Sequence, residues 1–367
     1  MGKPDSDVSM LASALAVPAD TIGFHSREPL GAGSVTGLQV ADEPAPYYVD
    51  TSGLEVPAET GLRSSEDAGA VRIWQHPADP HLPALAPVAF DSAAQTLLAR
   101  LGIHTDARPE IVAYRPGRRA VLRIGSGAAR VWLKVVRPSR VDRIVRAHAA
   151  AERSGLPVPP LHAWSGDGLI VMAQASGTPA QDVEWDPADL IDRVEHLRAL
   201  LAQVEWTHAA PGIAARLDWY AERADDGTQA LLTAARGLIE SEQAAAPAVV
   251  HGDLHFGQLF LDAGLISGMI DIDTLAVGDP AEDPAAFLSH ATASALLTRG
   301  PAQSRAWELA DLAAERWGTA RVRGLVVVHL AGHIISAAER GDQAYARGLT
   351  AAASAIVNGG RPSAPHG

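Results

Sequence analysis

The sequence has no cysteine among its 367 residues. This absence excludes a disulfide framework and a zinc site built from thiolates, and it suits the reducing cytosol. Aromatic residues are also scarce, at 5%, whereas 47% of the residues are hydrophobic. A chain of this length and apolar content can bury a substantial core and is long enough for two or three compact units.

Long apolar segments and an excess of positive charge are missing as well. The apolar stretch from Met10 to Val17 is short and follows acidic residues, so it does not predict a signal peptide. The stretch from Leu325 to Ala338 is interrupted by His329 and His333, which argues against a membrane span. The net charge of -13 argues against a nucleic-acid surface. We therefore expect a cytoplasmic protein without a nucleic-acid or membrane partner, and its oligomeric state stays open.

Lysine is almost absent. Lys3 and Lys134 are the two lysines among 30 basic residues, and the others are arginines. Because Lys3 lies in a terminus that we expect to fray, Lys134 is the one lysine of the folded part. This sequence uses arginine where only positive charge is needed, so we infer that Lys134 is kept for its ammonium group. The alternative is an edge-strand charge that opposes aggregation.

A dense set of polar residues lies between Val249 and Asp283. Two apolar segments, Ala248 to Val250 and Leu265 to Ile272, predict buried strands. The first is followed by a loop, and the second delivers Asp271 and Asp273. The loop carries four polar side chains, those of His251, Asp253, His255 and Gln258.

This layout supports phosphoryl transfer. Magnesium that bridges nucleotide phosphates prefers oxygen ligands, and Gln258 and Asp271 fit that role. The acceptor hydroxyl needs a carboxylate on a rigid loop to orient it and to take its proton, and Asp253 fits there. In the structural alternative, Asp253 and His251 form a hydrogen-bonded turn between two strands, and Asp271 caps the segment that follows.

The motif His251-Gly252-Asp253-Leu254-His255-Phe256-Gly257-Gln258, with Ile270-Asp271 and Gly278-Asp279-Pro280 after it, resembles the aminoglycoside phosphotransferase and choline kinase superfamily. Within that superfamily, the variant with His255 and Gln258 looks most like maltokinases and related actinobacterial sugar kinases. The resemblance implies an α+β, bilobal protein-kinase-like fold that uses ATP and Mg2+.

The resemblance also implies roles for the loop. Asp253 corresponds to the catalytic base, Gln258 and Asp271 to magnesium ligands, and His251 to a structural member of the loop. His255 falls where protein kinases carry a phosphate-contacting lysine, so it either takes that role or packs the loop. Asp283 is interpreted as an acid at the start of a helix.

On the nucleotide side, the resemblance makes Lys134 the strand lysine that contacts the α- and β-phosphates. The turn with Gly117 and Arg119 would cover the phosphates, and a plain hairpin with solvated arginines is the alternative. The helix from Val141 to Ser154 lacks a glutamate at the usual pairing position. Glu152 at its end, His148 or water would replace it. Adenine would bind at a hinge formed by Met172, Ala173 and Ala175.

Turn residues and apolar periodicity divide the chain. We predict a disordered tail over residues 1–20, a small β-rich N-terminal cap over 21–88 and a kinase-like N-lobe over 89–175. A helical C-lobe with the catalytic loop and the acceptor site follows over 176–358, and a disordered tail over 359–367. The role of the cap does not follow from its residues.

The acceptor site is expected among the helices of the C-lobe. Aromatic side chains that stack on sugar rings and acids that bind amines are candidates, although each of them is equally typical of ordinary helix packing. The candidates are Trp206, Asp218, Trp219, Trp307, Glu308, His329 and His333.

We therefore expect an ATP- and magnesium-dependent kinase of a small hydroxylated molecule, namely a sugar, an amino sugar or an aminoglycoside. Three alternatives remain. The first is a catalytically silent scaffold with a kinase fold, and the second is a kinase of a peptide hydroxyl. The third is a hydrolase that uses His251, Asp253, His255 and Asp271 as a transition-metal site.

Overall fold

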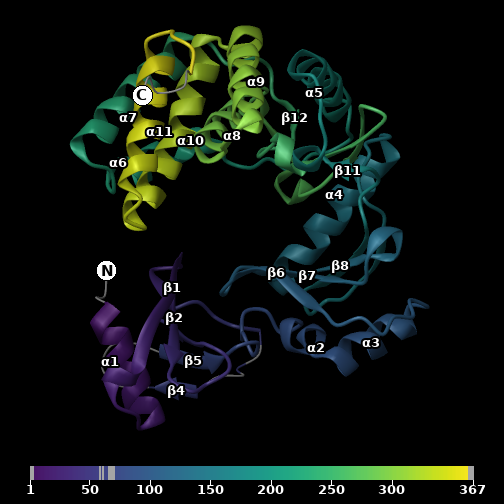
Figure 1. Ribbon diagram of the computed structural model, residues 1–367, viewed down its shortest axis with the longest axis vertical. Helices are drawn as coiled ribbons and strands as arrows, with labels where there is room; N and C mark the ends of the chain where they lie inside the picture. The colour runs from purple at the N-terminus through teal and green to yellow at the C-terminus, as the bar shows by residue number, and fades with distance from the viewer. Residues whose placement is uncertain (1–3, 58, 60–61, 65–70, 363–367) are drawn as a thin grey trace. The chain divides into compact units, whose positions relative to one another are not determined.

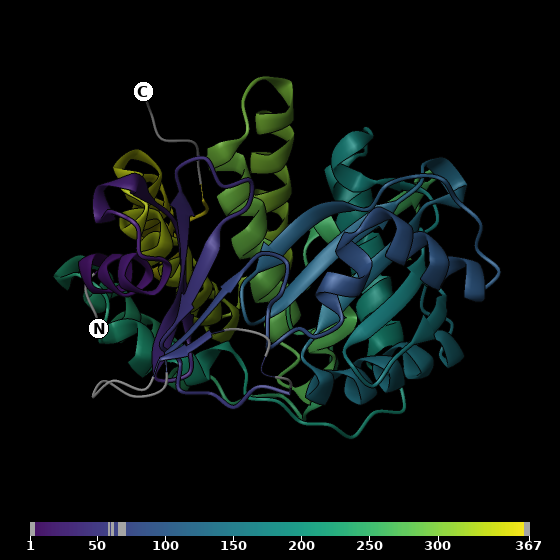
Figure 2. The same ribbon diagram turned by 90° about the horizontal axis from the view of Figure 1, so that it is seen from below.

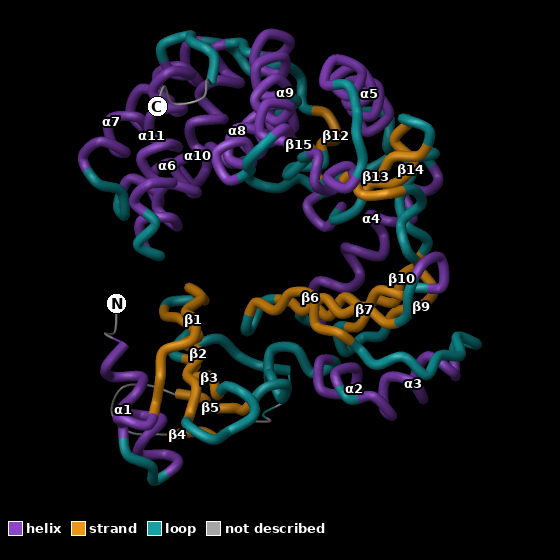
Figure 3. Tube along the Cα trace, in the orientation of Figure 1, coloured by secondary structure: helices purple, strands orange, loops and turns teal. Residues whose placement is uncertain are grey.

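The protein, seen here as a computed structural model, is described over residues 4–57, 59, 62–64 and 71–362. It divides into two compact units, Met1–Val145 with Pro160–Gln174 and Arg146–Pro159 with Ala175–Gly367. Strands dominate the first unit and helices the second (Figures 1 and 3). The predicted α+β fold class, β-rich first and helical afterwards, is confirmed.

The first unit begins with a five-stranded antiparallel sheet in the order β1-β2-β3-β5-β4. Alternating runs between turn residues produce these strands, and the apolar side of the sheet faces helix α1 (Pro4–Leu15), which lies along it in Figures 1 and 2. The strands are β1 (Ile22–Leu30), β2 (Gly33–Val40), β3 (Tyr47–Asp50), β4 (Leu62–Ser64) and β5 (Val71–Gln75), and the 3-10 helix η1 (Ala19–Thr21) precedes β1.

Helix α1 corrects the prediction of a disordered tail over residues 1–20. Leu11 is fully buried in a cluster with Leu38 and Val49 of the sheet, and the Thr36 hydroxyl donates a hydrogen bond of 2.6 Å to the buried Asp7 carboxylate. The segment is short and polar when considered alone, so its order depends on contacts with strands that follow it. Residues 1–3 lie outside the described residues.

The second sheet of the first unit has five antiparallel strands in the order β6-β7-β8-β10-β9. One face packs on helices α2 (Leu85–Ala89) and α3 (Asp91–Arg100) through Leu98, Leu122 and Leu133. Its strands are β6 (Glu110–Arg115), β7 (Arg119–Ile124), β8 (Val131–Val136), β9 (Leu161–Trp164) and β10 (Leu169–Ala173), and the 3-10 helices η2 (Gly127–Ala129) and η3 (Pro138–Arg140) flank β8. Helix α4 spans Val141–Arg153.

The second unit is a helical assembly with two small sheets, β11-β13-β14 and β12-β15. The strands are β11 (Thr178–Pro179), β12 (Ala248–Val250), β13 (Leu259–Asp262), β14 (Leu265–Met269) and β15 (Ala276–Gly278). The helices are α5 (Pro187–Leu201), α6 (Leu217–Ala221), α7 (Asp226–Ser241), α8 (Glu282–Leu297), α9 (Pro301–Trp317), α10 (Ala320–Glu339) and α11 (Gln343–Val357), with 3-10 turns η4 (Ala180–Asp182), η5 (Ile213–Arg216), η6 (Phe256–Gln258) and η7 (Ile272–Thr274).

Helix α10 is the centre of this unit and packs on α7, α8 and α11. Within the described part of the chain it is the one helix with the length and apolar content of a membrane span, at a mean hydropathy of 1.3, and 61% of that window is buried inside the fold. Its neighbours therefore account for its hydrophobicity. After α11, Arg361 pairs with Asp311 of α9 at 2.8 Å, so the predicted disordered tail is ordered as far as residue 362. Residues 363–367 lie outside the described residues.

Candidate active site

The central polar stretch forms a loop between strands, as predicted, but two further strands, β13 and β15, are also present. β12 pairs with β15, Val249 facing Val277. The loop after β12 ends in η6, and β13 and β14 then form a hairpin. The predicted second strand, Leu265 to Ile272, ends earlier, at Met269, because Asp271 adopts a left-handed conformation with φ of 63°. That conformation turns the chain into η7.

The carboxylate of Asp283, in the first turn of α8, fixes the start of the loop. One oxygen accepts the His251 backbone N–H at 2.9 Å and the other accepts the Gly252 N–H at 2.8 Å. Burial raises the pKa of Asp283, while these two donors and the His251 side chain act in the opposite direction. Asp283 therefore lies at the start of a helix, as interpreted from the sequence, and it also anchors the loop that follows β12.

The side chain of His251 connects the loop to the hairpin. Its Nε2 lies 3.2 Å from the carbonyl oxygen of Ile270, the residue before Asp271. The imidazole is fully buried, so this nitrogen carries the proton when it donates to that carbonyl. His251 thus ties the Asp253 loop to the Asp271 turn, which is the structural role that the resemblance implied.

Gln258 and Asp271 are brought together by the register of the hairpin. Leu259 pairs with Met269, and one step further the carbonyl of Gln258 accepts the Ile270 N–H at 3.0 Å. The side-chain Oε1 of Gln258 accepts the His255 N–H at 3.1 Å, which orients the amide and leaves a second lone pair on the oxygen. A carboxylate and an amide oxygen at adjacent positions are the hard donors that Mg2+ prefers, so these two residues fit the ion.

The rival transition-metal site is not assembled. In the portion of the chain that the structure describes, no three His, Cys, Asp or Glu side chains are arranged to hold a metal ion. His251 also commits its Nε2 to the Ile270 carbonyl. The described structure therefore gives no support to the alternative of a hydrolase with a His-Asp-His metal site.

Asp253 is partly open to solvent, with 42% of its side chain exposed. Its Oδ1 lies 3.5 Å from Nε2 of His290, a residue of α8. Burial raises the pKa of Asp253, but the hydrogen-bonding contact with His290 and the electrostatic effect of that ring outweigh burial and hold this pKa below its ordinary value. The carboxylate is therefore anionic at neutral pH and has a fixed neighbour on one side.

His255 caps η6 and stacks on His290. Its side chain accepts the Gln258 backbone N–H in a reciprocal cap, and its ring lies 4.3 Å from the His290 ring at an interplanar angle of 21°. Burial, reinforced by the charge of His290, lowers the pKa of His255 to about 4. A neutral imidazole at physiological pH matches the loop-packing alternative, and a phosphate contact of this residue stays a prediction.

Two of the predicted acceptor-site residues, His329 and His333 of α10, lie near His290 of α8. The His333 ring meets the His290 ring edge to face at 5.3 Å. Burial lowers the pKa of His333 to about 4 and that of His329 to about 3, in both cases with help from His290. His329 is one turn before His333, and its Nε2 is buried without a hydrogen-bond partner among the described residues.

The sequence interpretation missed His290. The available signal was its spacing from Asp283, since residues seven apart lie about two turns apart on one face of a helix. Asp283 holds the backbone of the loop and His290 contacts its Asp253 side chain. This spacing places the two residues on one face of α8, but it does not by itself show what that face contacts.

The other acceptor candidates are engaged in ordinary packing. The indole N–H of Trp206 donates to the Leu275 carbonyl at 3.0 Å, and Trp219, 44% exposed, lies under the Arg223 guanidinium at 4.0 Å. Asp218 forms an ion pair with Arg236. On α9, Glu308 is exposed, and Trp307 keeps a buried indole N–H without a partner among the described residues. Their contact with an acceptor stays a prediction.

The predicted nucleotide residues of the first unit lie on the second sheet. Lys134 is buried on β8, between Val121 of β7 and Ile170 of β10. On the hinge strand, the Ala173 N–H donates to the Pro160 carbonyl at 2.9 Å, and Met172 is half-buried. In the second unit, Ala175 is buried, and Glu152 is exposed in the last turn of α4. These placements leave the nucleotide roles as predictions.

The turn with Gly117 is held inside the first unit. The Gly117 N–H donates to the buried Asp79 carboxylate at 2.7 Å, and the Gly117 carbonyl accepts from Arg137 Nε at 2.7 Å. Arg119, the first residue of β7, pairs with Arg115 across the turn. Both backbone groups of Gly117 are therefore occupied by protein, and phosphate binding by this turn stays a prediction.

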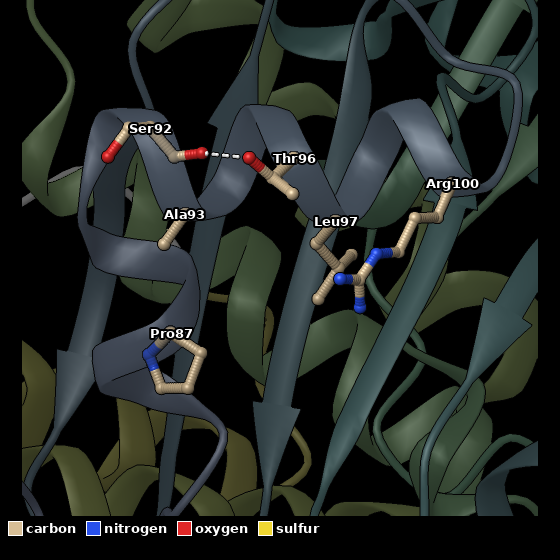
Figure 4. Close-up of a pocket in the computed structure, with 6 residues that line it drawn as sticks. All are labelled: Pro87, Ser92, Ala93, Thr96, Leu97 and Arg100. Carbon is tan, nitrogen blue, oxygen red and sulfur yellow. Dashed lines mark hydrogen bonds between the residues drawn. The ribbon is translucent and has the colours of Figure 1, made fainter.

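A pocket on α2 and α3 lies elsewhere in the first unit (Figure 4). It is lined by Leu97, small residues and Arg100, and its Thr96 hydroxyl donates to the Ser92 carbonyl of the same helix at 2.7 Å. No carboxylate, imidazole or lysine is among the residues that line it. It offers no group for acid, base or nucleophilic chemistry.

Solved structures that are similar to this chain include aminoglycoside phosphotransferases. The apo form of a thermostable mutant of APH(4)-Ia has a TM-score of 0.52 and 18% identity, covering 71% of this chain and 97% of that chain. A ternary complex of that thermostable enzyme with ADP and hygromycin B gives 0.52 and 16%, covering 72% of this chain and 97% of that chain. At such identities the similarity shows the fold, which is of the protein-kinase type.

A search of curated proteins gave no match. The sequence model of the phosphotransferase enzyme family matches residues 110–325. This match covers both the sheet that carries Lys134 and the loop that carries Asp253, and it includes more than half of the chain. The chain therefore belongs to the phosphotransferase enzyme family.

Proposed function

We propose that this phosphotransferase uses ATP and Mg2+ to phosphorylate a hydroxyl of a small molecule, namely a sugar, an amino sugar or an aminoglycoside. The observation that carries the proposal is the pair of hydrogen bonds by which Ile270, the residue before Asp271, joins His251 of the Asp253 loop and the backbone of Gln258. Phosphoryl transfer depends mainly on positioning and charge stabilisation, and a rigid loop of this kind supplies both.

In this mechanism Asp253 accepts a hydrogen bond from the acceptor hydroxyl, orients its oxygen toward the γ-phosphorus and takes the proton as the new P–O bond forms, while the bond from the γ-phosphorus to the bridging oxygen breaks and ADP leaves. Its lowered pKa keeps the carboxylate anionic for this purpose. Gln258 and Asp271 would hold Mg2+, which neutralises phosphate charge when bound. Lys134 would contact the α- and β-phosphates.

Two observations support the choice of acceptor class. The fold relative APH(4)-Ia forms a complex with hygromycin B, and the net charge of -13 favours the approach of a cationic molecule. The loop variant with His255 and Gln258 supports a relation to maltokinase-like sugar kinases. A sugar with or without amino groups is therefore the proposed acceptor.

The test measures ADP release from MgATP with glucose, glucosamine, maltose, kanamycin or hygromycin B as acceptor. Asp253→Ala should abolish acceptor-stimulated release while ATP still binds, and Asp271→Ala should weaken binding of MgATP. Asp262→Ala, an exposed aspartate at the end of β13, is the matched control and should keep the wild-type rate. If Asp253→Ala kept its rate, the assigned base would be wrong. ATP binding without stimulation by any acceptor would favour a silent scaffold or a peptide acceptor.

A further inference from the structure

Helix α8 brings one histidine against three groups from other segments. His290 Nε2 lies 3.5 Å from the Asp253 carboxylate. The same ring is stacked on His255 of the loop at 4.3 Å and is met edge-on by His333 of α10 at 5.3 Å. His290 is 26% exposed in its side chain, so it forms part of the wall around Asp253 and is not a surface histidine.

The helix that carries His290 is itself fixed to the loop. Asp283, two turns earlier on the same face, accepts the N–H groups of His251 and Gly252. The residues between them, Pro284 to Ser289, are all buried, so α8 has little freedom to shift. Helix α8 thus contacts the loop at two points. Asp283 holds the loop backbone just before Asp253, and His290 contacts the Asp253 side chain.

We propose that His290 is a positioning residue for phosphoryl transfer, which orients the Asp253 carboxylate toward the acceptor hydroxyl. This inference rests on the proposed function, because it assumes that Asp253 is the base. A carboxylate with 42% of its side chain exposed has several rotamers available in a loop. Contact with an imidazole whose ring is held on both sides selects one of them.

The rings around His290 explain why it can act in this way. The pKa of His333 is lowered to about 4, mainly by burial, so this ring is neutral at physiological pH. His255 and His333 hold the His290 ring by stacking and edge contacts, and His333 does so without adding positive charge beside the base. Asp253 therefore keeps its negative charge for the acceptor and gains a defined direction.

The experiment compares His290→Leu with His290→Gln. Leucine keeps most of the volume but removes the donor, whereas the glutamine amide places an N–H near the position of Nε2. We expect His290→Leu to lower kcat by about 10- to 100-fold, the usual cost of losing a group that orients a functional residue, with KM for ATP unchanged. His290→Gln should recover part of that loss. The exposed His196→Leu on α5 is the matched control and should behave as wild type.

The probe reaction is ADP release from MgATP with the acceptors of the panel above, with Asp253→Ala measured beside it. If Asp253→Ala abolishes turnover while His290→Leu keeps the wild-type kcat, the positioning role is wrong and the proposed function stands. Equal losses in kcat for the Leu and Gln variants, together with a lowered Tm, would show a packing role and would also overturn the inference.

A second readout needs neither nucleotide nor acceptor. NMR titration of His333 in wild type should give a pKa near the value of about 4, and His290→Leu should move it upward because the neighbouring His290 ring contributes to lowering it. An unchanged titration would mean that His290 does not contact His333 in solution, and the arrangement on which the inference depends would be absent.

Discussion

Asp283 shows how much of the active-site loop depends on one buried carboxylate. Its two oxygens accept the backbone N–H groups of His251 and Gly252, and it lies in the first turn of α8, where the helix dipole favours negative charge. Hydrogen bonds to a charged acceptor contribute about 1.5 to 3 kcal/mol each. The residue therefore matters for both folding and catalysis, although it touches no reacting atom.

We predict that Asp283→Ala lowers the free energy of unfolding by about 3 kcal/mol, because two buried N–H groups lose their acceptor. Acceptor-stimulated ADP release should also fall below detection, since Asp253 follows these two residues directly. Urea unfolding and the coupled ADP assay measure the two effects. Asp226→Ala, an exposed acid in the first turn of α7, is the control. A stable Asp283→Ala protein with wild-type turnover would contradict the anchoring role.

At the scale of elements, the turn between β6 and β7 depends on the segment that follows β5 and carries Asp79. Asp79 accepts the Gly117 N–H at 2.7 Å, the Tyr114 hydroxyl at 2.9 Å and the His81 N–H at 2.9 Å. His81 in turn pairs with Asp50 of β3 at 2.8 Å. Glycine is required at the turn because φ is +67° and a Cβ would lie 2.6 Å from Leu30. The N-terminal cap thereby holds the turn that we expect at the nucleotide.

We predict that Asp79→Ala releases this turn. The amides of Gly117 and His81 lose a buried acceptor, at a cost of about 3 kcal/mol. Hydrogen exchange at the Gly117 amide should accelerate by at least about 10-fold, because its protection depends on that carboxylate.

The matched control is Asp167→Ala, in the exposed turn between β9 and β10 of the same unit. It should leave exchange at Gly117 unchanged. If Gly117 exchanged equally slowly in Asp79→Ala, the turn would be rigid without the cap segment.

At the scale of the whole molecule, buried imidazoles make stability depend on pH. The pKa values of His255, His329 and His333 are lowered to about 4, 3 and 4, mainly by burial. Unfolding exposes these rings and returns their pKa values to about 6.5. Between about pH 4 and pH 6.5 the unfolded chain binds more protons than the folded chain. The contribution of these rings to the free energy of unfolding is therefore fully present above about pH 6.5 and is lost as the pH falls toward about 4. Glu282, whose pKa burial raises to about 7, acts in the opposite direction between about pH 4.5 and 7.

We predict that the three imidazoles outweigh Glu282. The free energy of unfolding should decline from about pH 6.5 to about pH 4.5, by roughly 1.4 kcal/mol per pH unit for each net proton. His329→Leu should flatten this slope, because it removes a buried titrating ring whose Nε2 lacks a partner among the described residues.

Urea unfolding followed by tryptophan fluorescence at several pH values provides the measurement. The control is His196→Leu, which replaces an exposed histidine. An identical pH slope for wild type and His329→Leu would show that this ring titrates normally in the folded state.

Much of the fold and part of the site followed from local pattern. The apolar segment from Ala248 to Val250 predicted β12, and the motif from His251 to Gln258 predicted the loop. Gln258 and Asp271 were predicted as a pair, and the hairpin register brings them together. The tail before residue 20 was mispredicted because the order of α1 comes from contact of Leu11 with strands formed later in the chain.

The sequence by itself determined which residues have useful chemistry, since the residue types and their spacing in one loop identify a base and oxygen ligands. It also indicated elements such as β12, because apolar patterning is a local property of the chain, whereas the order of α1 depended on strands that follow it. Only the tertiary structure decided that His290 meets Asp253 and that Asp79 holds Gly117. These contacts join segments more than thirty residues apart. They depend on how α8 packs on the loop and on how the first sheet packs against the second. The spacing of residues within a single segment does not predict packing of this kind.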